Sequence, residues 1–188
     1  MNKQLMKQHI SDMFVQMCEE SGFSNISVTD LCERCSINRG TFYYHFLDLN
    51  DLVCWIYHQE ITIPSIKFID ENKEGITQYI LDLLYSKKKF ILQVFGNSNP
   101  ETEKIFKNEA EQVWMHVYDL FIQQSPQLDE SKRQTLKLVI TYFCNAHWYA
   151  TYNWIKDGMK FGPEQFAHAL NIASSNGLKG TLKELLAK

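Results

Sequence analysis

The sequence of 188 residues has few of the residues that interrupt helices. It contains 4 prolines and 8 glycines, and no runs rich in Val, Ile and Thr alternate with turn dipeptides. Such runs are typical of β-sandwiches and barrels, and a fixed repeat would indicate a solenoid; neither is present. Because 45% of the residues are hydrophobic and 13% aromatic, the chain can bury a sizeable core. We therefore expect an all-α globular fold.

Long apolar segments and paired cysteines are missing as well. No apolar run reaches the about eighteen residues that a bilayer span needs, and the first residues lack the apolar stretch of a signal peptide. We expect no membrane partner and a soluble, cytoplasmic protein. The five cysteines form no even framework, so free buried thiols are expected. Cys32 and Cys35 have the spacing of half a zinc site, but no second pair completes it, so core packing is favoured.

Catalytic signatures are absent too. The sequence has no Gly-rich phosphate loop, no His-Glu-x-x-His, no Gly-x-Ser-x-Gly and no carboxylate pair at a distinctive spacing. An enzyme would need a site assembled from scattered residues. We expect neither catalytic residues nor a metal or cofactor.

Positive charge is scarce in the first third of the chain. The formal net charge is −3, and residues 1–58 hold four Lys and Arg against seven Asp and Glu, while the remainder balances at fifteen of each. A basic patch is the usual footprint of nucleic-acid binding. The charge of this part of the chain therefore argues against such a function.

Local signals predict two helices at the start of the chain. Apolar residues from Met6 onward follow the three-and-four spacing of one helix face, and Gly22 suits the position just past its end. Ser27 to Asp30 matches a capping box at the start of a short helix that runs to about Arg34.

A third and a fourth helix follow closely. Asn38 is a good N-cap for a short helix that ends near His45. Asp48 or Asn50 can begin the next helix, which we expect Pro64 to kink or end. Beyond it, turn signals separate further helices, with a turn expected at Asn176-Gly177. These helices lie near 75–86, 88–95, 101–124, 131–157 and 163–176, with a short one to 186.

Residues 27–46 have the dimensions of a helix-turn-helix, whose second helix enters the DNA major groove. At 100° per residue, one face of this second helix is apolar and would point inward; it carries Ile37, Phe42 and Phe46. Gly40 and Tyr44 lie on the opposite face, flanked by Thr41 and Tyr43. Gly40 costs about 1 kcal/mol relative to Ala inside a helix, so a close approach to another molecule is one reason to keep it.

The side chains of that face suit nucleic acid. Tyr and Thr hydroxyls can bond phosphates or base edges, Arg39 can reach a guanine or a phosphate, and a helix N-terminus favours an anion. The alternative to DNA contact is that Tyr43, Tyr44 and His45 pack against a neighbouring helix or a dimer partner.

Gly22-Phe23, Ile26 to Cys32 and Asn38 to Phe46 resemble the N-terminal domain of the TetR family of transcriptional regulators, over about residues 5–57. The resemblance implies a homodimer with a helix-turn-helix DNA-binding domain, here 1–58, that binds a palindromic operator. The larger domain, here 59–188, would bind a small effector and dimerise through its last two long helices. By position, the implied DNA contacts come from Ser27, Val28, Thr29, Asn38, Arg39, Gly40, Thr41, Tyr43, Tyr44 and His45.

The sequence departs from the family at the start of the fourth helix. The family commonly has a phosphate-binding lysine there, and this chain has Leu47-Asp48-Leu49. Weak non-specific DNA binding is expected, with a shallow salt dependence, because each neutralised phosphate contributes about 0.9 to the slope. The alternative to a ligand-responsive repressor is therefore a TetR-like interaction protein or activator whose DNA binding depends on a protein partner. The stretch from Tyr43 to Tyr57 is also similar to TetR-like proteins associated with dihydroxyacetone kinase operons, some of which activate transcription.

Aromatic residues are dense in the helix expected over 131–157 and in the helix before it. They can line an apolar ligand pocket, or they can form the core and the dimer interface; for any single residue the second use is favoured. The candidates for the effector pocket are Trp114, Tyr118, Phe143, His147, Trp148 and Tyr152.

Overall fold

The computed structural model describes residues 2–71, 74–96 and 100–186, and every regular element in these ranges is a helix. The all-α prediction is thus confirmed. In chain order the elements are α1 (Lys3–Ser21), η1 (Phe23–Asn25), α2 (Val28–Arg34), α3 (Arg39–His45), α4 (Leu49–Tyr57), η2 (His58–Thr62), α5 (Ile63–Asp70), α6 (Ile76–Ser86), α7 (Lys88–Gly96), α8 (Pro100–Gln124), α9 (Glu130–Lys156) and α10 (Pro163–Leu186).

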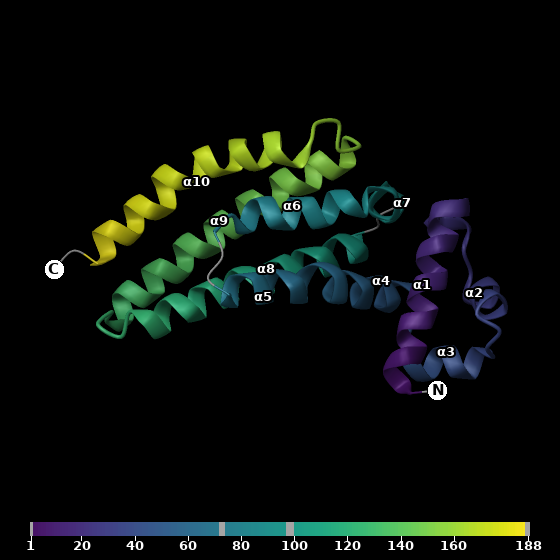
Figure 1. Cartoon of the computed structure of the whole chain (residues 1–188). Helices are drawn as coiled ribbons and strands as arrows, with labels where there is room; N and C mark the ends of the chain where they lie inside the picture. Colours follow the sequence, from purple (N-terminus) through teal and green to yellow (C-terminus); the bar gives the residue numbers. More distant parts are fainter. Residues whose placement is uncertain (1, 72–73, 97–99, 187–188) are drawn as a thin grey trace.

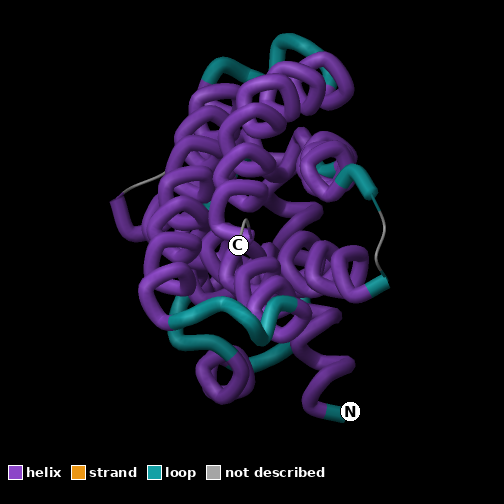
Figure 2. Tube along the Cα trace, turned by 90° about the vertical axis from the view of Figure 1, so that its left-hand side faces the viewer, coloured by secondary structure: helices purple, strands orange, loops and turns teal. Residues whose placement is uncertain are grey.

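The three N-terminal helices form a cluster at one end of the molecule, beside a bundle of longer helices (Figure 1). α3 lies across the N-terminal end of α1. In the bundle, α8 and α9 pack along each other, and α10 packs on α6 and α9. Figure 2 views these long helices end-on, with α10 on the outside of the bundle. No helix among the described residues is long and apolar enough to cross a bilayer.

The start and stop signals act where the sequence predicts them. Gly22 ends α1 with a φ of 84°, a conformation that glycine adopts without strain. Ser27 and Asp30 form the expected capping box at the start of α2. The side chains of Asn38 and Asp48 cap α3 and α4.

Pro64 does not end the fourth helix, so that half of the expectation was wrong; the other half, a kink at Pro64, stays a prediction. The helix runs from α4 through η2, which is a π-helical turn, and on through α5 to Asp70. Proline lacks an N–H group, and its ring clashes with the carbonyl four residues earlier in a regular α-helix. Here the amide of Ile63 bonds to the carbonyl of His58, five residues back, and this wider turn admits Pro64. The division of the chain at 58/59 stays a prediction.

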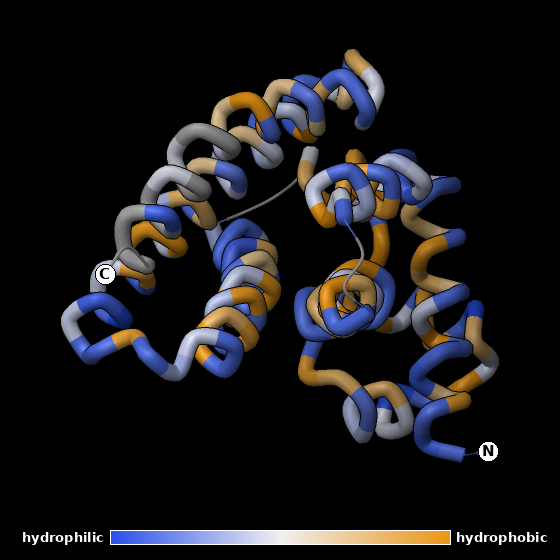
Figure 3. Tube along the Cα trace, turned by 60° about the vertical axis from the view of Figure 1, so that its left-hand side comes forward, coloured by the Kyte–Doolittle hydropathy of each residue, from blue (hydrophilic) through white to orange (hydrophobic). Residues whose placement is uncertain are grey.

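One buried core extends from the N-terminal helices into the bundle. Apolar residues line the inner faces of both parts (Figure 3). Phe14 of α1 meets Phe90 of α7 edge-to-face with ring centroids 6.3 Å apart. A second, smaller cluster forms between α8 and α9 around Leu136. The cysteines are free, and Cys18, Cys32, Cys35 and Cys144 are buried as expected. Burial raises the pKa of the Cys18 thiol to about 12.

The turn expected at Asn176-Gly177 was also wrong, because α10 continues through it to Leu186. Gly177 instead lies against α9. A Cβ atom placed on it would come within 2.6 Å of the Phe143 ring. The same residue type thus serves close helix packing here rather than a turn, and a turn signal alone does not distinguish the two uses.

The contact between Gly177 and Phe143 predicts the effect of a substitution. Gly177→Ala gains about 1 kcal/mol of helix propensity, but overpacking costs about 1–3 kcal/mol, so we expect a net loss of about 1 kcal/mol. Urea unfolding at fixed protomer concentration measures it. In a Phe143→Leu background, where the ring is removed, the same change should cost less. Equal costs in both backgrounds would contradict the close-packing explanation.

Candidate nucleic-acid interface

α3, the second helix of the helix-turn-helix, packs against the chain through buried aromatic side chains. Phe42 and Phe46 are fully buried, with ring centroids 5.9 Å apart. Phe46 also meets Trp55 of α4 edge-to-face at 5.9 Å. These contacts are the inward face that the 100° periodicity predicts, and they fix α3 against α4.

The opposite face of α3 is open to solvent. Tyr44 is 69% exposed and Tyr43 is 48% exposed, so neither packs into the core of its own chain. Gly40 is exposed, and a Cβ there would meet only the side-chain oxygen of Asn38, at 3.1 Å. Arg39 donates a long hydrogen bond of 3.4 Å to the hydroxyl of Tyr43.

The ten predicted DNA-contacting residues lie together on α2, α3 and their N-caps. Seven are exposed: Ser27, Thr29, Asn38, Arg39, Gly40, Tyr43 and Tyr44; Val28, Thr41 and His45 are half-buried. Two of them also have structural roles, because Ser27 and Asn38 accept the capping hydrogen bonds of their helices. Their contacts with DNA stay a prediction.

Lysines from α1 border the same face, and the sequence analysis missed them. The Nζ atom of Lys3 lies 5.2 Å from the ring centroid of Tyr44. The Nζ atom of Lys7 lies 4.9 Å from the ring of Phe46 and 5.7 Å from that of Trp55. A signal was available, because both lysines continue the apolar stripe of α1 toward the N-terminus at helical spacing.

His45 lies beside these lysines at the end of α3. Burial, followed by the charges of Lys3 and Lys7, lowers the pKa of its imidazole from 6.5. Its Nδ1 atom is buried and has no hydrogen-bond partner among the described residues. The imidazole is therefore held neutral at pH 7, and the positive charge of this border comes from the lysines.

The acidic residues of the N-terminal helices are largely engaged in structure. Asp30 belongs to the capping box of α2, and hydrogen bonds from Ser27 lower the pKa of its carboxyl from 3.8. Asp48 accepts the amide of Asp51, whose own carboxylate accepts the amide of Leu47. α3 itself contains no acidic residue. The charge deficit of residues 1–58 is therefore not located on the exposed face of α3.

A buried carboxylate joins α8 to the π-helical turn. Glu109 is 5% exposed. Its Oε2 atom accepts a hydrogen bond of 2.7 Å from Thr62 and lies 2.8 Å from Nδ1 of His58. Gln112 donates to Oε1 at 2.9 Å. His58 and Thr62 are the first and last residues of η2, so the Oε2 atom of Glu109 contacts both ends of the turn. The sequence analysis did not find this network.

The six candidates for an effector pocket do not gather around one cavity. Trp114 and His147 meet edge-to-face at 5.1 Å, and Trp148 and Tyr152 lie 5.7 Å apart. Tyr118 packs with Trp114 on the small cluster between α8 and α9, whereas Phe143 faces Gly177 of α10. Their role in ligand binding stays a prediction.

Two surface hollows lie elsewhere. One, of about 460 Å³, is lined by polar residues of α6 and α10, including Gln78 and Glu164. The other, of about 500 Å³, lies between α1 and the bundle and is lined by residues such as Asp12, Glu60 and Phe90. None of the six aromatic-pocket candidates lines either hollow. In the described part of the chain, no group of three His, Cys, Asp or Glu side chains could hold a metal ion.

His147 of α9 is hydrogen-bonded to α10. Its Nε2 atom lies 2.6 Å from Oγ of Ser174, and that hydroxyl donates its own proton to the carbonyl of Leu170. The imidazole must therefore donate from Nε2. Burial lowers its pKa from 6.5, which favours the neutral ring.

Comparisons with known proteins agree with this geometry. A TetR-type family model described as the transcriptional regulator C-terminal region matches residues 71–176, more than half of the chain. Helix-turn-helix-type transcriptional regulators of Staphylococcus aureus, in strains MRSA252 and USA300, are each 26% identical over 123 residues. The match covers 61% of this chain and 66% of each relative, just under two thirds of its length.

Solved structures share the fold. A TetR-family transcriptional regulator from Syntrophomonas wolfei superimposes with a TM-score of 0.63 at 12% identity, covering 100% of both chains. The dihydroxyacetone kinase operon activator DhaS gives a TM-score of 0.61 at 18% identity, covering 96% of both. At these identities the likeness concerns the fold alone.

The environment of His147 predicts a pH dependence of stability. Its pKa is lowered in the folded chain, so the unfolded chain binds more protons as the pH falls through 6.5. The stabilising contribution is present above pH 6.5 and is lost below it. Urea titrations between pH 7.5 and 5 should show a smaller acid-side loss for His147→Gln than for the wild type. The matched control is His168→Gln on the exposed side of α10, which should follow the wild type.

Proposed function

The chain belongs to the TetR family of transcriptional regulators, and we propose that it inserts α3 into the major groove of an operator. The observation that carries the proposal is the exposed face of α3. Gly40, Tyr43 and Tyr44 present polar groups and a close backbone approach, while Phe42 and Phe46 hold the helix rigidly from behind. A rigidly supported helix with an open polar face is what base-edge and phosphate contacts require.

We propose that the regulator is a homodimer that pairs α9 and α10 with those of a second copy. α9 carries three large hydrophobic side chains in open solvent: Leu138 at 72%, Tyr142 at 69% and Tyr149 at 66% exposure. Their spacing of four and seven residues places them on one helix face. Ile172 of α10 is 57% exposed. A contiguous apolar stripe of this kind is typical of a protein interface.

Such a dimer would bind a palindromic operator. It would act in the cytoplasm, where the operator would lie. Its twofold axis would present two copies of α3 to half-sites about one helical turn apart, near 34 Å. The continuous helix of α4, η2 and α5 would connect each recognition helix to the bundle. We propose that a small effector bound by the C-terminal bundle shifts the populations of two arrangements of this helix. The effector must bind the two arrangements with different affinities.

Repression is the first candidate for the outcome of operator binding. Activation is the second, favoured by the shared fold with a protein named as an operon activator. A reporter gene carrying the operator distinguishes them, because deletion of the regulator raises expression under repression and lowers it under activation.

Selection of duplexes from a random DNA library at low salt, followed by anisotropy titration, tests DNA binding directly. We expect enrichment of a palindrome that binds with nanomolar affinity. Failure to enrich any sequence at low salt would contradict the proposal and would favour an interaction protein whose DNA binding depends on a partner.

Substitutions on α3 separate recognition from folding. Tyr44→Ala should weaken specific binding by about 1–3 kcal/mol, because one good contact is lost while the exposed site leaves the fold intact. Gly40→Ala should weaken binding with unchanged or higher thermal stability. Phe42→Ala is the control for unfolding and should cost about 3–5 kcal/mol of stability. Unchanged operator affinity in Tyr44→Ala would remove that residue from the interface.

Charge placed in the apolar stripe should separate the protomers. Tyr142→Glu with Leu138→Glu puts four like charges into a twofold interface, so we expect monomers at micromolar concentration in analytical ultracentrifugation. Leu5→Glu, at a leucine of α1 that is 61% exposed, is the matched control and should stay dimeric. A double variant that remains a dimer would place the interface elsewhere.

A further inference from the structure

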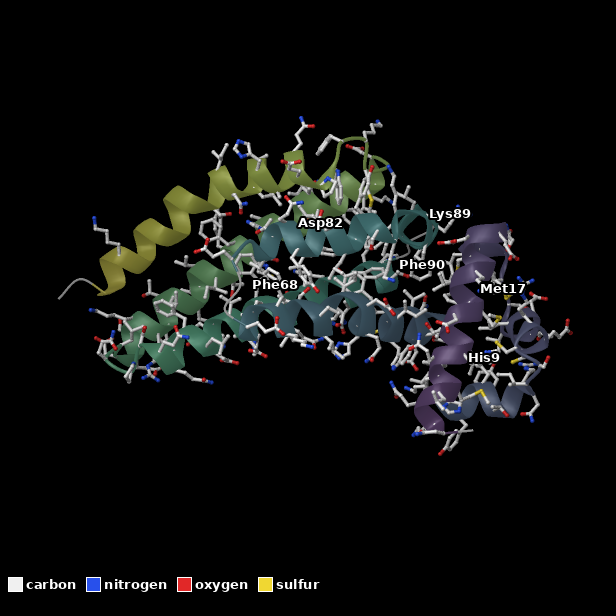
Figure 4. The ribbon with its side chains drawn as sticks, viewed as in Figure 1. His9, Met17, Phe68, Asp82, Lys89 and Phe90 are labelled. Carbon is white, nitrogen blue, oxygen red and sulfur yellow. The ribbon has the colours of Figure 1, made fainter. Side chains whose placement is uncertain are left out.

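The face of α1 that packs on the core carries lysines near the N-terminus of the helix. Ile10, Phe14 and Cys18 are fully buried along one face of the helix. Counting back at helical spacing, the same stripe reaches Lys7 and Lys3. By this point α1 has passed the apolar core and lies against α3. Figure 4 labels His9 on this half of α1, where its Nε2 atom is 3.4 Å from the carbonyl of Cys35.

The two ammonium groups occupy defined positions on the α3 side. Lys3 lies over the ring of Tyr44, the most exposed tyrosine of α3. Lys7 lies over Phe46, which ends α3, and over Trp55 in the second half of α4, so its charge lies at the α3 side of the junction between the two helices. That junction holds Leu47-Asp48-Leu49, which has no lysine of its own. The aromatic faces orient both stems while leaving the charged heads near solvent.

In the part of the chain that the structure describes, neither lysine is neutralised by an acidic partner. Among the described residues, no carboxylate forms an ion pair with Lys3 or Lys7. The nearest acidic groups at the junction, Asp48 and Asp51, accept the capping amides of α4. Arg39 adds a third cation on the other flank of the exposed face. The surface around α3 therefore carries unpaired positive charge despite the negative sum of residues 1–58.

We propose that Lys3 and Lys7 bind DNA phosphates beside the groove that α3 enters, in place of the lysine that is missing at the start of α4. The proposal rests on the proposed DNA-binding function and assigns its electrostatic contacts to α1. Lysine binds phosphate as a point charge and needs no bidentate geometry, which suits ammonium groups that lie over aromatic rings.

The salt dependence of operator binding tests this assignment. Each phosphate contact contributes about 0.9 to the slope of log K against log salt concentration. Because a dimer brings two copies of each lysine to the operator, Lys3→Gln with Lys7→Gln should remove four contacts and lower the slope by about 3.6, measured by anisotropy with the selected duplex over a range of KCl concentrations. Lys3→Arg with Lys7→Arg keeps the charges and should keep the slope. Lys137→Gln, at an exposed lysine of α9, is the control for net charge and should leave it unchanged.

Moving the charge provides a second, independent readout. Leu47 is 80% exposed and precedes α4, so Leu47→Lys should be tolerated. In the Lys7→Gln background it should restore about 1.8 of the slope, because it returns one cation per protomer to the same junction. A loss of packing at Lys7 would not be repaired by this change.

The outcomes separate the two proposals. A double glutamine variant that binds the operator with the wild-type slope overturns the assignment to α1 and leaves DNA binding intact. Lower affinity with an unchanged slope and a reduced thermal midpoint also overturns it, since the lysines would then be structural. If the wild type enriches no duplex but binds an acidic protein through these lysines, both proposals fail.

Discussion

A buried carboxylate of α8 anchors the long helix that follows α3. Glu109 of α8 is removed from water, a cost of several kcal/mol unless its oxygens are satisfied. His58 and Thr62 meet this need from the two ends of the π-helical turn. Both belong to the long helix that begins beside α3, so the carboxylate fixes the rotation of that helix against the bundle. The aromatic contact of Trp55 with Phe46 then carries this orientation to α3.

A π-helical turn in this position has consequences for how the protein could respond to a ligand. One extra residue in the turn changes the register between α4 and α5, and such turns are common at functional sites. Pro64 makes the wide turn favourable locally, and Glu109 satisfies side chains at both of its ends. A movement of α8 would therefore act on the turn through these hydrogen bonds as well as through the packing of α8 on α4, η2 and α5. This gives the proposed effector response a specific point of contact between the bundle and α4.

The sequence predicted those parts of the fold whose causes are local. Asn38 and Asp48 cap their helices because capping needs only the next three residues, and the buried face of α3 follows from its periodicity. The π-helical turn escaped prediction because its partner, Glu109, lies 47 residues beyond Thr62 and nothing near Pro64 announces it. Gly177 was assigned to a turn because a glycine that permits close helix packing looks the same in sequence. The pocket candidates of α9 were grouped together, but Phe143 faces α10, His147 meets Trp114 of α8, and Trp148 and Tyr152 pack on the core. Composition alone cannot assign such faces.

In the N-terminal helices, the positions of the individual charges matter more for phosphate binding than their net sum. Salt screens interactions between exposed charges beyond about 8 Å at physiological ionic strength, so a bound phosphate responds mainly to its nearest neighbours. Asp30, Asp48 and Asp51 contribute to the negative total, yet each is engaged in building a helix start. Lys3 and Lys7 form no ion pair among the described residues; they lie over aromatic rings and border the exposed face of α3. The acidic residues that make this part of the chain look unsuited to DNA thus include those that begin α2 and α4, the helices before and after α3.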